Sequence, residues 1–267
     1  MKKQVGPAAK PVENMAALEK FLASDERFFV LGLFSSSSSS LQSAFALTSN
    51  KLRDDYTFLK TSNAEILKKY DVPADGEAII ALKKYDDEVT KFTEKPKQLE
   101  DWVARNSLPL VGEFNTKYAP AYSKRNLPIL KLYAKVDFGS GSNSKQANYY
   151  VNRLKPVAVE FQGKLLVTLV DSTKNSADLT DLGFKDKETP ILIEQGRSKY
   201  LFKNKFTAEN LKEWVQQFLD GKAERHVKSE PIPAANDGPV KVVVGKTFDD
   251  IVMDPTKDVL IEFYAPV

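Results

Sequence analysis

The sequence predicts an α/β protein built from two repeats of one unit. Short apolar runs typical of strands buried on both faces alternate with segments whose apolar residues recur at helical spacing. The elements follow the order β-α-β-α-β-β-α, and the order starts again near Leu108. The length of 267 residues also suits about two domains, each able to bury its own core.

The first unit, residues 1–107, supplies every element of that order. A short amphipathic helix capped by Asn14 precedes the first buried strand, Phe28–Phe34. The remaining expected elements are a helix over 41–52, a strand over 56–60, a helix around 66–70, a hairpin of 78–82 and 89–93, and a closing helix after Pro96.

The second unit, residues 108–221, repeats the pattern. Its first buried strand is Leu127–Tyr133, and a long helix over 145–161 contains Pro156, which should kink it. The other expected elements are a strand over 165–171, a helix over 175–182 ended by Gly183, a hairpin of 191–194 and 199–203, and a last helix between Thr207 and Gly221.

Residues 222–239 have the composition of an exposed linker, and residues 240–267 that of an incomplete third unit. This last part contains an expected strand at 240–244, a helix at 248–253 and an apolar strand at 258–267. It lacks the later elements and therefore cannot close a core of its own. We expect residues 246–267 to be mobile or to pack on a neighbour.

The order of elements is that of the thioredoxin fold, and residues 238–266 carry a more specific resemblance. This segment, which ends in Phe263-Tyr-Ala-Pro, is similar to the strand that leads into the Cys-x-x-Cys site of the endoplasmic-reticulum protein disulfide isomerases. The resemblance is strongest to the subfamily with three catalytic domains, and next to the glycoprotein-specialised subfamily. It implies that the two units are the redox-inactive b and b′ domains of a protein of the endoplasmic reticulum lumen, followed by the truncated start of a catalytic domain.

Composition excludes several functions for the chain itself. It has no cysteine, so it cannot exchange disulfides, although the resemblance implies that its full-length parent forms, reduces and rearranges them. We expect no catalytic residue, metal site or cofactor. The net charge of +3 argues against nucleic acid as a partner. No apolar run approaches the ~20 residues of a membrane span, and residues 1–7 lack the apolar core of a signal peptide.

The resemblance places the missing cysteines at the strand-to-helix junctions. In the first unit this junction is the serine run Ser35–Ser40, and in the second it is 134–143. No histidine lies near the serine run, because His226 is the single histidine and lies in the linker, so we interpret the run as flexible linker rather than a nucleophile site. Pro190, after Thr189, occupies the position of the family's cis-proline, where we expect it to shape the fold rather than bind substrate.

The resemblance also implies a site for unfolded polypeptide in the second unit. The matching positions are Leu130, Leu132, Leu154 and Thr168. Periodicity alone assigns the leucines to the core, which is the alternative. Thr168 replaces a large apolar residue, and losing apolar area weakens such binding by about 0.8 kcal/mol per methylene.

A second implied site is basic. Lys91, Lys145 and Arg153 correspond to positions at which the glycoprotein-specialised subfamily docks the acidic arm of the lectin chaperones calnexin and calreticulin. Lys145 and Arg153 are eight residues apart and share one helix face. The alternative is ordinary solvated surface. The expected function is therefore a non-catalytic spacer that binds unfolded secretory polypeptides, or one that docks lectin chaperones or other foldases.

Overall fold

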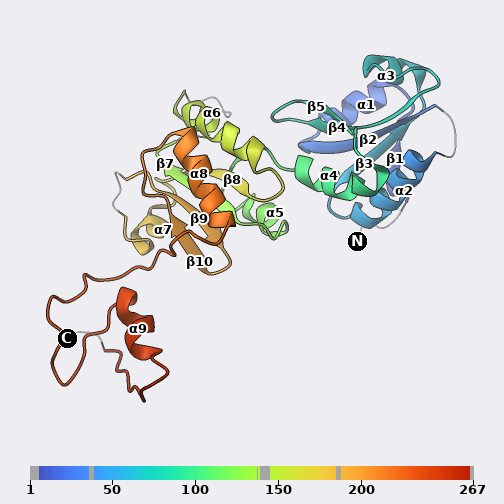
Figure 1. Ribbon diagram of the computed structural model, residues 1–267. Coiled ribbons are helices and arrows are strands. Elements are labelled where there is room, and N and C mark those ends of the chain that lie inside the picture. The colour runs from blue at the N-terminus through green and yellow to red at the C-terminus, as the bar shows by residue number, and fades with distance from the viewer. Residues whose placement is uncertain (1–5, 36–38, 137, 139–144, 185–187, 265–267) are drawn as a thin grey trace. The chain divides into compact units, whose positions relative to one another are not determined.

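The computed structural model describes residues 6–35, 39–136, 138, 145–184 and 188–264, which divide into two units between Leu110 and Val111. Each unit contains one five-stranded mixed sheet with helices on both faces (Figure 1). The predicted α/β class and the tandem thioredoxin-like repeat are confirmed.

The first sheet has the strand order β1-β3-β2-β4-β5. β2 pairs in parallel with β3 and antiparallel with β4. The strands are β1 (Ala9–Pro11), β2 (Phe28–Phe34), β3 (Thr57–Thr61), β4 (Glu77–Lys83) and β5 (Val89–Lys91). The helices are α1 (Met15–Leu22), α2 (Ser40–Leu52), α3 (Ala64–Lys69) and α4 (Leu99–Asn106), with a 3₁₀ turn, η2 (Pro96–Gln98), before α4.

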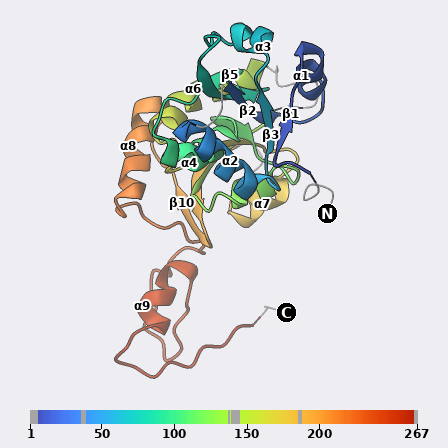
Figure 2. The ribbon, with the colours of Figure 1, turned by 90° about the vertical axis from the view of Figure 1, so that its right-hand side faces the viewer.

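The first unit has a separate apolar core on each face of its sheet. One core joins alternate β2 residues to α1 and α3 through Leu18 and Ile66. The other joins the intervening β2 residues to α2 and α4 through Phe45 and Trp102. Figure 2 shows α2 and α4 together on the side of the sheet turned toward the viewer. All seven residues of β2 are buried, as the continuous apolar run predicts.

The second sheet has the order β10-β9-β7-β8-β6. Its central strand, β7, is parallel to β8 and antiparallel to β9. The strands are β6 (Val111–Glu113), β7 (Ile129–Ala134), β8 (Leu166–Asp171), β9 (Ile191–Gln195) and β10 (Ser198–Leu201). The helices are α5 (Ala119–Ser123), α6 (Lys145–Glu160), α7 (Ser176–Asp181) and α8 (Ala208–Leu219).

Several predicted helix ends are confirmed by their caps. The Asn14 side chain accepts a hydrogen bond from Ala17 N at 2.9 Å, and the Thr207 hydroxyl accepts one from Asn210 N at 3.2 Å. Gly183 follows α7 with a φ of 86°, a conformation that glycine adopts without a steric penalty.

The structure adds an edge strand to each predicted unit. β1 and β6 are each three residues long and pair in parallel with β3 and β8. A run this short contains too few residues to display the period of two that identifies a strand in sequence, and Pro11 in β1 argues against one.

The strands predicted at 240–244 and 258–267 are not formed in the described residues. The intervening helix does form, as α9 (Phe248–Val252) after the 3₁₀ turn η3 (Gly245–Thr247). A strand requires a partner for its backbone hydrogen bonds, and no strand of this segment supplies one. Its apolar residues remain outside a core: Leu260 is 100% exposed. Residues 265–267 lie outside the described range.

The interpretation of Ser35–Ser40 as flexible linker is wrong at its C-terminal end. Ser39 is the N-cap of α2: its hydroxyl accepts a hydrogen bond from Gln42 N at 2.9 Å and donates one to the Glu77 carboxylate. Ser40 is the first residue of α2. Residues 36–38 lie outside the described range.

The beginning of the expected linker is attached to the second unit. Arg225 forms a β-bridge with Tyr200, and His226 N donates to Lys199 O at 2.6 Å. The His226 ring stacks on Phe184 with 6.1 Å between centroids. The segment around 225–226 therefore behaves as a continuation of the β10 edge.

We predict that Gly32→Ala destabilises the first unit. A Cβ at this position in β2 would lie 2.5 Å from the Phe34 ring and 3.0 Å from the Phe45 ring, so both rings would have to move. The free energy of unfolding should fall by about 1 to 3 kcal/mol. The chain has two tryptophans, Trp102 in α4 and Trp214 in α8, so fluorescence in a Trp214→Phe background follows urea unfolding of the first unit alone.

The control is Gly238→Ala, where the new Cβ would meet Val240 O at an ordinary 3.6 Å. An unchanged urea midpoint for Gly32→Ala, equal to that of the control, would contradict the close packing described around β2.

Candidate functional site

Neither strand-to-helix junction can carry thiol chemistry. In the first unit, β2 ends at Phe34 and the chain reaches Ser39 as the cap of α2. In the second unit, β7 ends at Ala134 and α6 begins at Lys145, with 137 and 139–144 outside the described range. The whole sequence contains no cysteine, so these junctions keep the fold without its redox group.

The four residues predicted to bind unfolded polypeptide lie in the core of the second unit. Leu130, Leu132, Leu154 and Thr168 are all 0% exposed. Helix α6 packs on β8 and α8 and covers the face of the sheet that carries Leu130 and Leu132, whereas Thr168 pairs with Lys131 and lies on the opposite face. The Thr168 hydroxyl donates to Leu130 O at 2.9 Å, which explains how a polar group is tolerated there. This burial agrees with the alternative that the three leucines belong to the core, and in this structure a bound chain could not touch any of the four side chains.

The Thr189–Pro190 bond is trans, as is every described peptide bond, which corrects the expected cis-proline. Pro190 lies directly before β9, and its carbonyl accepts a hydrogen bond from Tyr133 N at 3.0 Å. An X–Pro bond favours trans by about 0.5 to 1 kcal/mol, and here the trans chain continues the pairing of β9 with β7.

Exposed residues on α6 form the surface most suited to a partner. Lys145, Tyr149 and Arg153 follow one another at a spacing of four and are all exposed. Val159, 56% exposed, lies six residues, or about 1.7 turns, beyond Arg153. We refer to Lys145, Tyr149, Arg153 and Val159 as the α6 outer face.

The α6 outer face combines charge with aromatic area. The Arg153 guanidinium lies 3.8 Å from the centre of the Tyr149 ring, and Tyr149 is 48% exposed. Tyr149 in turn meets Tyr150 edge to face at 5.1 Å. Among the described residues, no carboxylate forms an ion pair with Lys145 or Arg153. The two cations are therefore available to an acidic partner.

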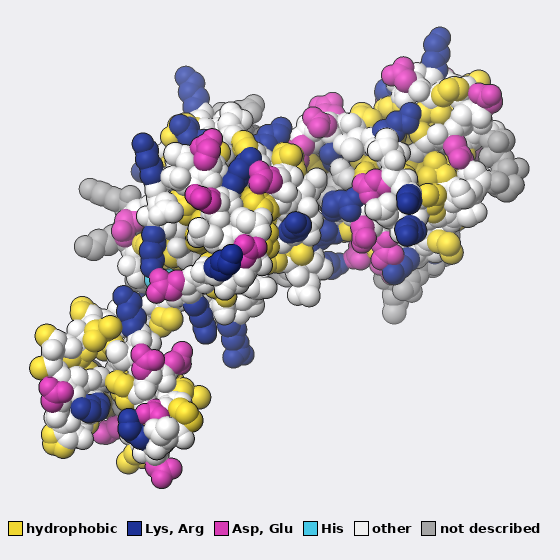
Figure 3. Space-filling view, viewed as in Figure 1, with side chains coloured by type: hydrophobic (Ala, Val, Ile, Leu, Met, Phe, Trp, Pro, Cys, Tyr) yellow, Lys and Arg dark blue, Asp and Glu magenta, His cyan; other side chains and the backbone are white. Residues whose placement is uncertain are grey.

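The third predicted cation, Lys91, is exposed on β5, an edge strand of the first unit. The structure thus unites Lys145 and Arg153 on one helix face and assigns Lys91 to the other unit. Figure 3 shows basic side chains spread over the visible surface with acidic ones between them, in keeping with the small net charge of +3. A partner must therefore recognise a local arrangement rather than a general positive field.

Sequence reasoning missed two features. Tyr149 stands midway between Lys145 and Arg153, so its place on the face could have been found from helical spacing. Lys131, inside the apolar run of β7, forms an ion pair with Glu194 of β9 at 2.5 Å and lies 3.9 Å from the Phe114 ring centre. A charged residue within a buried strand was the available signal for this pair.

The Lys131–Glu194 pair lies on the face of β7 opposite Leu130 and Leu132, because side chains alternate along a strand. Tyr133 lies on the same face as Lys131. Burial raises the pKa of Tyr133 well above its ordinary value, with further increases from Glu194 and Asp178, so its phenol stays protonated. This polar group of residues is structural, since its charges are paired inside the unit.

We predict that Glu194→Gln destabilises the second unit by about 3 kcal/mol, because it leaves the buried Lys131 ammonium without its counter-charge. Lys131→Met should lower the free energy of unfolding by less than Glu194→Gln does. The Glu194 side chain is 23% exposed and can be hydrated when it loses its partner, and the methionine thioether packs well on the Phe114 ring. Urea unfolding in a Trp102→Phe background reports on this unit.

The matched control is Glu224→Gln, which removes the partner of Lys203 in a fully exposed pair and should leave the urea midpoint unchanged. If Glu194→Gln also leaves the urea midpoint unchanged, the Lys131–Glu194 pair does not stabilise the fold.

Within the part of the chain that the structure describes, no three His, Cys, Asp or Glu side chains gather in a way that could hold a metal ion. Across the same residues, no helix combines the length and apolar character needed to cross a membrane.

Comparisons with known proteins agree with this architecture. The thioredoxin-like domain family matches residues 34–217. The whole chain is 33% identical to protein disulfide-isomerase A4 of Bos taurus over 278 residues, 43% of that protein. It is also 33% identical to protein disulfide-isomerase A3 of Gallus gallus over 284 residues, 55% of that protein. The chain thus spans about half the length of the relatives it matches.

Among solved structures, the bb fragment of ERp72 aligns with 82% of this chain at a TM-score of 0.60 and 23% identity, and all of that fragment is covered. The zinc-bound form of human ERp44 aligns with 83% of this chain at a TM-score of 0.56 and 18% identity. These two likenesses establish the fold. The chain belongs to the thioredoxin-like domain family and is a homologue, over its full length, of the protein disulfide-isomerases.

Proposed function

We propose that this chain is the non-catalytic binding and spacer region of a protein disulfide isomerase of the endoplasmic reticulum lumen. The observation that carries the proposal is two complete thioredoxin-like units in a sequence without a single cysteine. A fold kept without its redox group retains two uses, which are to hold neighbouring domains apart and to present a surface. The full-length parent would form, reduce and rearrange disulfides in secretory proteins.

The α6 outer face is the surface we propose for binding unfolded polypeptide. Leu130, Leu132, Leu154 and Thr168 are buried, so a polypeptide must contact exposed residues instead. Tyr149 and Val159 offer apolar area, and the Arg153 guanidinium adds hydrogen-bond donors above the Tyr149 ring. Aromatic and arginine side chains are enriched at binding surfaces because they combine apolar area with hydrogen-bonding groups.

A second candidate function uses the same face for an acidic partner. Lys145 and Arg153 are exposed and about 12 Å apart along the helix, and neither has a carboxylate partner among the described residues. This arrangement favours an acidic segment such as the arm of the lectin chaperones calnexin and calreticulin, or an acidic surface of another foldase. Lys91, exposed on β5 of the first unit, would be a separate contact of the same sign.

We predict that reversing both α6 charges, Lys145→Glu with Arg153→Glu, weakens binding of a lectin-chaperone arm domain roughly tenfold at low salt. Each exposed ion pair contributes up to ~1 kcal/mol, and the reversal also introduces repulsion. The measurement is an amide NMR titration at low and at physiological salt. Shifts should gather around residues 145–153 and fade as salt rises.

The matched control is Lys135→Glu with Lys164→Glu, which reverses two exposed lysines outside α6 and should leave the affinity nearly unchanged. Equal losses in both variants would attribute the effect to net charge. If no shifts occur at either salt concentration, the acidic-partner function is wrong and polypeptide binding remains as the proposal.

A further inference from the structure

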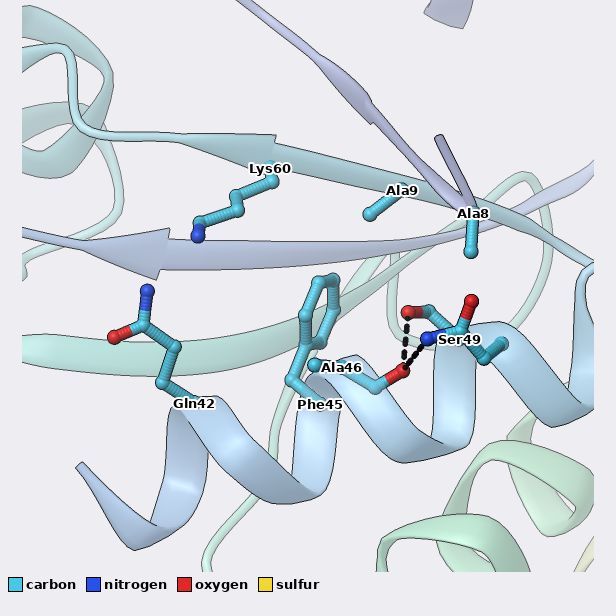
Figure 4. A pocket seen from close by; sticks show the side chains of 8 residues that line it. Ala8, Ala9, Gln42, Phe45, Ala46, Ser49 and Lys60 are labelled. Carbon is cyan, nitrogen blue, oxygen red and sulfur yellow. Dashed lines mark hydrogen bonds between the residues drawn. The ribbon is translucent and has the colours of Figure 1, made fainter. Parts of the chain in front are cut away.

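A cavity of about 180 Å³ opens on the first unit between α2 and the sheet edge formed by β1 and β3. Figure 4 shows the Phe45 ring of α2 at its centre, Ala8 and Ala9 at one end, and the Lys60 and Gln42 side chains directed toward each other at the other end. The cavity is remote in the sequence from the α6 outer face and belongs to the other unit.

The floor of the cavity is apolar and fixed in place. Phe45 is 2% exposed, and its ring meets those of Phe34 and Phe58 edge to face at 5.5 and 5.8 Å. Ala9 and Ala46 add small apolar side chains around it. A ligand group placed here therefore contacts apolar surface that does not need to rearrange.

The polar groups at the Ala46 end of the cavity already form hydrogen bonds with one another. Ala46 O accepts hydrogen bonds from Ser49 Oγ at 3.0 Å and from Asn50 Nδ2 at 2.9 Å. Arg53, at the end of α2, donates to Gly6 O at 2.8 Å and so ties the chain before β1 to this helix. This end of the cavity therefore suits an apolar ligand group better than a charged one.

The opposite end of the cavity carries a cation, Lys60. Lys60 Nζ lies 5.7 Å from the Phe34 ring centre, and no carboxylate among the described residues forms an ion pair with it. The Lys60 backbone is held in the sheet, because its carbonyl accepts Val12 N at 2.8 Å. Lys60 is exposed, so a negative group at this end would form an ion pair of ordinary surface strength with it.

We propose that this cavity binds a small organic anion with an apolar body: a carboxylate joined to an aromatic or branched aliphatic group. The apolar body lies on Phe45 and Ala46, and the carboxylate faces Lys60 Nζ. A free acid and the C-terminal residue of a polypeptide both present this chemistry. The site adds a ligand-binding role to the first unit that does not depend on the function proposed for α6.

The test is an amide NMR titration of the full chain with four probes. N-acetylphenylalanine and its carboxamide form one pair, and a tetrapeptide ending in leucine with a free or an amidated C-terminus forms the other. At least one carboxylate probe should shift the signals of Phe45, Ala46 and Lys60, and its amide should bind more weakly. A response to the first acid identifies a small-molecule site, and a response to the peptide identifies a C-terminus site.

Lys60→Gln should lower the affinity for the carboxylate probe roughly two- to fivefold, which is the range expected for one exposed ion pair. The affinity for the amide probe should not change. Lys69→Gln is the matched control, because Lys69 also lies 5.7 Å from an aromatic ring, that of Tyr70, but is on α3 outside the cavity. Ala46→Trp, an exposed helix position, should block the cavity and abolish both responses.

The proposal is overturned if neither carboxylate shifts these signals, if acid and amide bind equally, or if Lys69→Gln weakens binding as much as Lys60→Gln. The heteronuclear spectrum of each variant shows directly that it is folded, so a loss of binding can be separated from a loss of structure.

Discussion

Burial of one central strand on both faces is the constraint on which each unit depends. β2 and β7 each pair with a parallel strand on one side and an antiparallel strand on the other, and helices cover them above and below. All of β2 is buried and so is all of β7 beyond Ile129. Because apolar burial is the main stabilising term, residues on these strands have little freedom to serve as binding sites. We therefore propose that binding uses the outer faces of the helices and the sheet edges.

This division explains why the fold can persist without cysteines. The strand-to-helix junctions lie at the ends of β2 and β7, and Ser39 caps α2 by hydrogen bonds alone. The two candidate surfaces lie elsewhere: the α6 outer face in the second unit, and the cavity around Phe45 and Lys60 in the first. Both combine an aromatic ring with a cation that has no carboxylate partner among the described residues.

Sequence periodicity predicted the long, strongly patterned elements and their order, because apolar runs and caps are local signals. It missed β1 and β6, whose pairing depends on distant strands, and it assigned strands to 240–244 and 258–267, which the described residues do not form. For the site, the family resemblance indicated positions in the sequence but not whether their side chains are exposed. Arg153 and Leu154 are adjacent in the sequence, yet Arg153 is exposed and Leu154 is buried. The cavity gathers residues from three distant segments, which no local pattern reveals.

The central claim is that polypeptide contacts the α6 outer face. The most direct measurement replaces Tyr149 with a photo-reactive phenylalanine and illuminates the chain with a reduced, alkylated protein that cannot fold. Val89, 47% exposed on β5 of the first unit, carries the same group as a control for non-specific apolar contact. The account predicts crosslinks from position 149 well above those from position 89. Equal crosslinking from the two positions, or none from position 149, would contradict the claim that polypeptide contacts the α6 outer face.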